Sequence, residues 1–347
     1  MNSTTESPAA PSVQAPATRS ASALTTFETL QRLSIAILTL VLLIVALSHA
    51  RSVPLWMSNL LTYAAGVGIV ACGMTMVMIG GGFDLSVGST AAVCGVVCVM
   101  TLQLLAAQGI GVALPLAILA TLLVGILLGA INGALIAYVG VNPFVVTMST
   151  ALIFRGIGLV LTSGGQSQQV PNDFKPAFGS LYWGVAAEIG GLKISMPVII
   201  FAGVFLLSIY VLRFTRFGHY VYAVGGNEKA SWLAGINTRF VTAGTYVISG
   251  LVCAVAALVW TALSTTAQAS DHYGKEMIVI ASVVVGGTPL SGGRGGLLST
   301  LCGLLLLCTI EQLLTQFGID PQYRQIVTGL IIVTVVAIDS YFKRRLN

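Results

Sequence analysis

The polar residues that could do chemistry in this chain are few, and most of them interrupt apolar runs. The clearest group is the segment 80–89, Gly-Gly-Gly-Phe-Asp-Leu-Ser-Val-Gly-Ser. Its glycines break a helix and permit positive φ, so Asp84 could cap the next helix through the backbone N–H of Ser86 or Val87. A capped tight turn is one interpretation. The other places Gly82, Asp84 and Ser86 in a translocation path or a hinge, because acidic groups at membrane depth commonly serve function.

Further polar groups lie in or near apolar segments at Asn132, Thr147 and Arg155. Such side chains face the interior of a helix bundle, where they find protein partners or water. Hydrogen bonds between helices are one role for them, and contact with a passing solute is the other. We take Asn132 and Thr147 as candidates for the translocation path.

The sequence predicts no catalytic residue and no metal site. His49, His219 and His272 are far apart, and neither a zinc spacing nor a Gly-x-Ser-x-Gly elbow occurs. The glycine-rich stretch 286–296 lacks the Gly-Lys-Ser/Thr ending of a phosphate-binding loop. We therefore expect that the chain is not an enzyme, binds no cofactor and holds no ATP in such a loop. The six cysteines lie in apolar stretches and are expected to pack.

Composition places these groups in a membrane. Hydrophobic residues make up 56% of the 347 residues and charged residues only 8%, with a mean hydropathy of +0.94. Soluble proteins carry roughly 25% charged residues. The chain is therefore an integral membrane protein with lipids as neighbours. Its sixteen basic residues form no dense patch, so nucleic acid is not an expected partner.

Apolar runs predict an all-α polytopic bundle of about ten spans, with eight as the lower alternative. Residues 1–27 are rich in Ser, Thr, Ala and Pro and are expected to form a disordered cytoplasmic tail, followed by a permease domain over 28–347. The expected spans are 33–49, 57–79, 89–107, 112–138, 143–162, 194–212, 241–264, 276–290, 297–317 and 325–342.

The Lys and Arg residues predict the orientation. With ten spans and the N-terminus inside, ten basic residues lie on the cytoplasmic side and five outside, and Arg155 within a span completes the sixteen. The excess of positive charge on cytoplasmic loops then places both termini and the polar segment 213–240 in the cytoplasm.

That polar segment contains residues that typically begin and end a helix, and they predict a short helix over 228–234. Asn227 suits its N-cap, Glu228 the positive end of its dipole, and Gly235 its left-handed C-terminal residue. A two-turn helix is unstable alone and must pack on something. One interpretation is an interfacial turn that Trp232 holds at the lipid headgroups. The other is a docking element for a cytoplasmic partner.

Four segments together resemble the permease subunits of bacterial ABC importers for sugars, of the ribose, xylose and galactose type. They cover most of the chain from about residue 57 onward, and their order and spacing are more specific than any one of them. The segments are 81–89, 142–147, 216–230 and 281–293.

The resemblance implies a pair of permease subunits, identical or not, in the bacterial inner membrane. It also implies cytoplasmic ABC ATPase subunits, which would use the ATP, and an extracytoplasmic sugar-binding protein. The segment 227–237 would be the coupling helix that seats in the ATPase. The residues expected to make that contact are Asn227, Glu228, Lys229, Trp232, Leu233 and Gly235.

The chain departs from the family pattern at two places. Ile278 stands where the family usually has Asp, which puts the substrate or the docking of the binding protein in question. Gly82-Phe83 stands where Gly-Ile is usual before Asp84.

We therefore expect a permease that imports a monosaccharide or related polyol and is driven by a separate ATPase. The rival is an ion-coupled secondary transporter that uses Asp84 or Glu311, because glycine-broken helices near polar residues suit that class too. Both glycine-rich breaks are expected on the cytoplasmic side, which does not fit a simple five-plus-five inverted repeat. A non-transporting membrane scaffold is a third alternative.

Overall fold

The computed structural model describes residues 36–320 and, beyond them, 323, 324, 326, 327, 329, 330, 333, 334 and 337. Over these residues the protein is mostly helical. Within the described residues, seven helices are long and apolar enough to cross a membrane: α2 (Val53–Ile79), α3 (Val87–Leu104), α4 with its π-helical end (Ile110–Val139), α5 (Pro143–Leu161), α7 (Met196–Phe214), α10 (Thr238–Ser264) and α12 (Leu297–Gln316).

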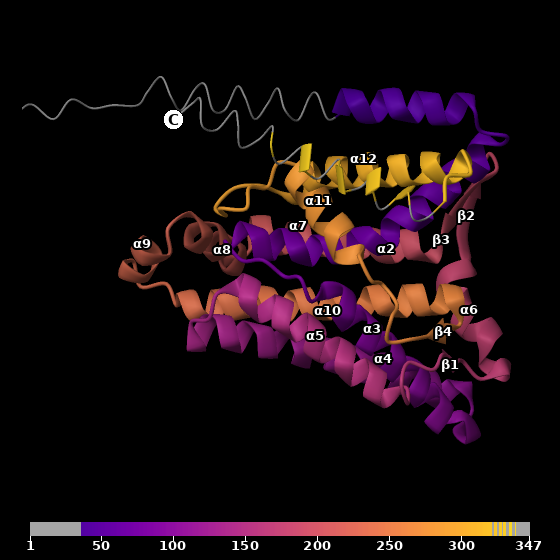
Figure 1. Cartoon of the computed structure of the whole chain (residues 1–347), viewed down its shortest axis with the longest axis horizontal. Helices are drawn as coiled ribbons and strands as arrows, with labels where there is room; N and C mark the ends of the chain where they lie inside the picture. Colours follow the sequence, from indigo (N-terminus) through magenta and orange to yellow (C-terminus); the bar gives the residue numbers. More distant parts are fainter. Residues whose placement is uncertain are drawn as a thin grey trace, which may run out of the picture.

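The long helices run alongside one another between two differently built ends (Figure 1). The short helices α8 (Arg216–Gly226) and α9 (Glu228–Leu233) lie at one end. At the other end lie α6 (Lys175–Trp183) and the strands. The core is built around α2 and α3, which are largely buried, whereas α4, α5 and α7 leave most of their apolar surface exposed.

Helices α4 and α10 approach each other closely because glycines line their contact. A Cβ on Gly125 would lie 2.4 Å from the carbonyl oxygen of Gly250, and one on Gly129 would lie 2.3 Å from that of Tyr246. These two glycines are four residues apart and therefore share one face of α4. Small residues of this kind let helix backbones pack closely in membranes. The contact brings Asn132 of α4 and Ser249 of α10 into the same buried region.

Two elements begin inside the bundle instead of at its surface. After α2 ends at Ile79, the segment 80–86 leads into α3, whose first turns are buried. Helix α11 (Lys275–Val285) has 11 residues, about 17 Å at the α-helical rise, which is too short to cross the membrane. The prediction of a span over 276–290 was therefore wrong: the run ends where the backbone turns at Gly286 and Gly287, the latter with φ of 94°.

The other predicted spans agree with the helices to within a few residues, apart from the two at the ends. The first run forms a shorter apolar helix, Ala36–Ser48. The last predicted span, 325–342, and the predicted tail, 1–27, lie outside the described residues or largely so. The total number of spans, now without 276–290, and the cytoplasmic position of both termini stay predictions.

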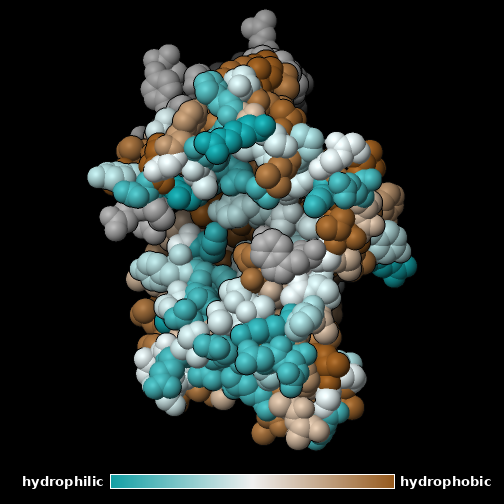
Figure 2. Space-filling model, turned by 90° about the vertical axis from the view of Figure 1, so that its right-hand side faces the viewer, coloured by the Kyte–Doolittle hydropathy of each residue, from teal (hydrophilic) through white to brown (hydrophobic). Residues whose placement is uncertain are grey.

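Two small antiparallel sheets lie at the end opposite α9, which the all-α prediction did not include. Strand β1 (Gln168–Gln169) pairs with β4 (Thr266–Ala267), and β2 (Val185–Ile189) pairs with β3 (Leu192–Ser195). Glycines 190 and 191, both with positive φ, form the turn between β2 and β3. Figure 2 shows this end of the molecule, where hydrophilic side chains gather over much of the surface.

Candidate coupling and translocation site

The predicted short helix is present, and asparagine side chains cap the N-termini of this helix and of the helix that follows it. Asn227 Oδ1 accepts a hydrogen bond from the Ala230 N–H at 2.9 Å and so starts α9. Asn237 Oδ1 accepts from the Phe240 N–H at 3.1 Å and starts α10. Gly235 has φ of 84°, as its predicted C-terminal position requires. The helix ends at Leu233, one residue earlier than predicted.

Helix α9 protrudes from the end of the molecule and buries almost none of its surface (Figure 1). Ser231 is its one buried residue, while Trp232 and Leu233 are 66% and 71% exposed. Such a short helix has little stability of its own. Large apolar side chains gathered on an exposed element are typical of a contact surface.

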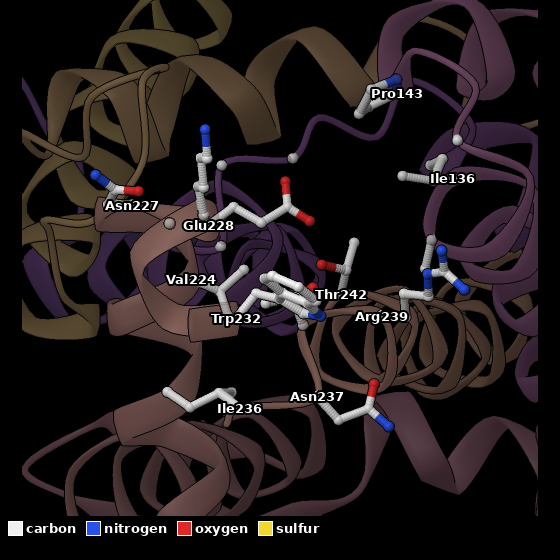
Figure 3. A pocket seen from close by; sticks show the side chains of 18 of the residues that line it. Ile136, Pro143, Val224, Asn227, Glu228, Trp232, Ile236, Asn237, Arg239 and Thr242 are labelled. Carbon is white, nitrogen blue, oxygen red and sulfur yellow. The ribbon is translucent and has the colours of Figure 1, made fainter. Parts of the chain in front are cut away.

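A cavity of about 1250 Å³ opens beside α9. Its lining comes from the segment 80–82, the stretch 136–143 that joins α4 to α5, helix α9 and the first residues of α10. Figure 3 shows Glu228 and Trp232 on one side of the opening and Ile136 and Pro143 across from them. The cavity therefore links the short helix to the glycine break after α2.

A buried polar network stands behind that break. Asp84 Oδ1 accepts from the backbone N–H of Ser86 at 3.0 Å and from its hydroxyl at 2.6 Å. Asp84 Oδ2 accepts from the Ser249 hydroxyl at 2.9 Å. The Ser86 hydroxyl in turn accepts from the Asn132 side-chain amide at 2.8 Å. All four residues are buried, so the network ties α10 and α4 to the start of α3.

The side chain of Tyr246 in α10 binds the backbone of the same segment. Its hydroxyl donates to the Phe83 carbonyl and accepts from the Phe83 N–H, both at 3.1 Å. A Cβ on Gly82 would lie 2.6 Å from that hydroxyl oxygen, so a glycine is required there. The Phe83 ring, a departure from the family pattern, packs near the Phe144 ring with centroids 6.4 Å apart.

The structure brings four of the five predicted path residues together: Gly82, Asp84, Ser86 and Asn132 surround the break. Thr147 is buried but does not join them, because its hydroxyl donates to the Pro143 carbonyl in its own helix at 2.8 Å. Tyr246 and Ser249 were missed. Their polar groups in an otherwise apolar run were the available signal, although their distance from Asp84 in sequence gave no reason to pair them.

A second non-helical segment, 268–274, enters the bundle from the opposite end and leads into α11. Arg155 of α5 holds it by donating to the backbone carbonyls of Ala269 and Asp271. A Cβ on Gly88 of α3 would lie 2.4 Å from Glu276 Oε2 and 2.8 Å from the His272 carbonyl oxygen. The starts of α3 and α11 are therefore in direct contact.

The loop 286–296, between α11 and α12 (Leu297–Gln316), lies on the other side of the glycine break at 80–82. The Tyr222 hydroxyl of α8 donates to the Gly295 carbonyl at 3.1 Å. Burial raises the pKa of this hydroxyl, so Tyr222 stays protonated and keeps its role as a donor. Within the described part of the chain, no three His, Cys, Asp or Glu side chains lie close enough together to hold a metal ion.

Comparison with known proteins identifies the family. The family described as branched-chain amino acid transport system / permease component matches residues 56–336. The chain belongs to this permease family. The match covers the spans, the break at 80–86 and the exposed helix α9, and so agrees with the resemblance seen in the sequence. No solved structure matches the permease.

Curated relatives of the permease include permease proteins named for sugar transport. It is 34% identical over 310 residues to the ribose import permease protein of Escherichia coli strain K12, which covers 89% of this chain and 93% of the relative. It is 34% identical over 276 residues to the D-allose transport system permease protein of the same strain, with 80% of each chain covered. It is also 34% identical over 284 residues to that strain's galactofuranose transporter permease protein, with 81% and 79% covered. The ion-coupled alternative finds no support among these relatives.

Proposed function

We propose that this permease is the membrane-spanning subunit of an ATP-driven importer for a monosaccharide or related polyol. The family match and the sugar-permease relatives support the class of transport and of substrate. The observation that carries the mechanism is the capped, exposed helix α9 beside a cavity that reaches the glycine break. The chain itself performs no catalysis and binds no cofactor or metal. ATP is hydrolysed by a separate subunit.

The partner of α9 is a cytoplasmic ABC ATPase. Its groove would cover Trp232 and Leu233 and supply the packing that this short helix lacks. Glu228 and Lys229 are also exposed and add a charged rim to the contact. Asn227 and Gly235 set the two ends of the helix and act through its geometry.

The cavity beside α9 is the cytoplasmic end of the translocation path. Sugars pass by exchanging hydrogen bonds with weak polar contacts, and the segment 80–82 lines the cavity with backbone groups. Asp84, Ser86 and Asn132 sit behind that lining and act as a hinge support. Thr147, in contrast, is proposed only as a packing residue of α5, because its hydroxyl is used within its own helix.

The remaining parts of the importer follow from the family. A second permease copy or a related permease completes the membrane domain, and an extracytoplasmic binding protein delivers the sugar to the end that carries the two small sheets. In the permease domain over 28–347, without a span at 276–290, the 213–240 segment and both termini lie in the cytoplasm, in agreement with the distribution of Lys and Arg.

Reconstitution tests the proposal. Vesicles that contain the permease, its ATPase and the binding protein should take up a labelled pentose or hexose only when ATP is present on the cytoplasmic side. Leaving out the ATPase should abolish uptake. Uptake by the purified permease alone, driven by a proton or sodium gradient, would reject the proposal in favour of a secondary transporter.

Variants of α9 test the contact with the ATPase. Trp232→Ala and Glu228→Arg should each lower co-purification of the ATPase and sugar uptake. The loss should be about tenfold for Trp232, the aromatic side chain that the ATPase would cover. Leu104→Ala is a matched control, because Leu104 is 82% exposed but ends α3, far from α9. Normal ATPase binding and uptake in both α9 variants would reject the docking role of this helix.

A further inference from the structure

Three glycine-bearing segments meet directly at the base of α9. The Gly293 N–H donates to the Ile79 carbonyl at 2.8 Å and joins the loop after α11 to the end of α2. A Cβ on Gly225 would lie 1.8 Å from the same Ile79 oxygen, and one on Gly292 would lie 2.7 Å from Gly81 Cα. Backbone therefore touches backbone here, without side chains between. We call this contact of Ile79 and Gly81 with Gly225, Gly292 and Gly293 the glycine junction.

The junction adjoins the N-terminal side of α9. Gly225 and Gly226 end α8, and the next residue, Asn227, caps α9. A rigid contact at Gly225 therefore passes any displacement of the start of α9 to Ile79 and Gly81. Close-packed interiors transmit such displacements because they have no free volume to absorb them.

The C-terminal side of α9 reaches the same segment by a second route. Four residues, 234–237, connect α9 to α10. Tyr246 and Ser249 lie within the first half of α10 and hold Phe83 and Asp84 by hydrogen bonds of 3.1 Å and 2.9 Å. Tyr246 is completely buried, so its ring cannot move without α10.

Both sides of α9 thus hold the short segment 79–84, and the glycines of this segment line the cavity. We propose that the glycine junction and the Tyr246–Ser249 pair are positioning elements that relay movement of α9 to the segment 79–84 and so change the cytoplasmic opening of the transport path. This relay rests on the proposed function, because the ATPase must supply the movement. It adds the residues that convert the movement into a change of the path.

Two neighbouring glycines of α8 give a matched test of the junction. Gly225 has no room for a Cβ, whereas a Cβ on Gly226 would meet nothing within 4 Å, and both have helical backbones. The measurement is sugar uptake per ATP hydrolysed in vesicles that hold the complete importer. We expect Gly226→Ala to leave this ratio unchanged. Gly225→Ala should lower it by about tenfold, the size of a typical coupling between sites, while the ATPase still co-purifies and hydrolyses ATP.

A second variant keeps the test decisive if Gly225→Ala fails to fold. Tyr246→Phe removes only the hydroxyl that holds Phe83, and Tyr210→Phe, on the exposed face of α7, is its control. Tyr246→Phe should lower uptake per ATP, and Tyr210→Phe should not. A purely structural role would lower the amount of folded importer but leave this ratio intact.

The outcomes separate the two proposals. An unchanged ratio in Tyr246→Phe, together with an unchanged ratio in any folded Gly225→Ala importer, overturns the relay and leaves the proposed function standing. If the unaltered permease neither binds the ATPase nor supports ATP-driven uptake, the proposed function itself fails, and the relay fails with it.

Discussion

The side-chain amide of Asn132 donates to the Ser86 hydroxyl at 2.8 Å across the contact between α4 and the start of α3. The same hydroxyl donates to Asp84, so one serine connects the amide to the carboxylate. Asn132 Oδ1 is buried and has no hydrogen-bond partner among the described residues. The Asn132 amide is therefore held only through its NH₂ group, and its contribution to the stability of the fold depends on the Ser86 hydroxyl.

Replacing Asn132 by Ala should destabilise the folded permease. The substitution removes the buried amide that donates to the Ser86 hydroxyl oxygen, and leaving a buried acceptor without its donor costs about 1–3 kcal/mol. The measurement is the thermal unfolding midpoint of the purified permease in detergent. Ser149→Ala is the control, because Ser149 lies on the exposed face of α5. A midpoint shift no larger than that of the control would contradict the importance of the network.

Exchanging the carboxylate of Asp84 and the amide of Asn132 should be better tolerated than the single change Asn132→Asp. Asn132→Asp adds a second carboxylate near Asp84, and like charges in a buried region oppose each other. The double variant Asp84→Asn, Asn132→Asp returns to one carboxylate and one amide. We expect sugar uptake in the order unaltered permease, double variant, Asn132→Asp. If the double variant is no better than Asn132→Asp, the two side chains do not act through the same network.

The parts of the site that local sequence determines could be predicted. Asn227 and Gly235 lie within a few residues of the backbone that they cap or turn. The residue types at these two positions therefore predicted the short helix α9. The same holds for Asp84, whose bond to the Ser86 N–H spans two residues. Apolar runs of membrane length likewise predicted most of the long helices.

Contacts between distant segments could not be predicted in this way. Ser249 is 165 residues from Asp84, and no local rule pairs them. Gly292 belonged to a recognised glycine-rich stretch and Gly225 only to the polar segment 213–240, and only the folded chain shows that they meet at Ile79 and Gly81. The apolar run 276–290 was short but was still predicted as a span, yet its glycines end α11 at Val285.

Gly88→Ala should lower the stability of the folded permease, whereas a Gly→Ala change at an open helix position should raise it. A Cβ at Gly88 would press on the Glu276 carboxylate and the His272 carbonyl, and overpacking costs about 1–3 kcal/mol. Gly203 of α7 has nothing within 4 Å of a Cβ, so Gly203→Ala should gain up to about 1 kcal/mol from helix propensity. Thermal unfolding in detergent measures both. Equal shifts in the same direction would contradict the close contact between the starts of α3 and α11.

Arg155→Gln should loosen the segment 268–274. The guanidinium donates to the carbonyls of Ala269 and Asp271, and hydrogen bonds to a charged group contribute about 1.5–3 kcal/mol each. Ala269 is buried, so a cysteine placed there by Ala269→Cys should react slowly with a water-soluble thiol reagent, after the exposed native Cys302 is changed to Ser. Adding Arg155→Gln should speed that reaction by about tenfold or more, as the loss of at least one such bond implies. A cysteine at exposed Ser270 is the control, because it should react quickly with or without Arg155. An unchanged rate at position 269 would show that the segment is held in place without the arginine.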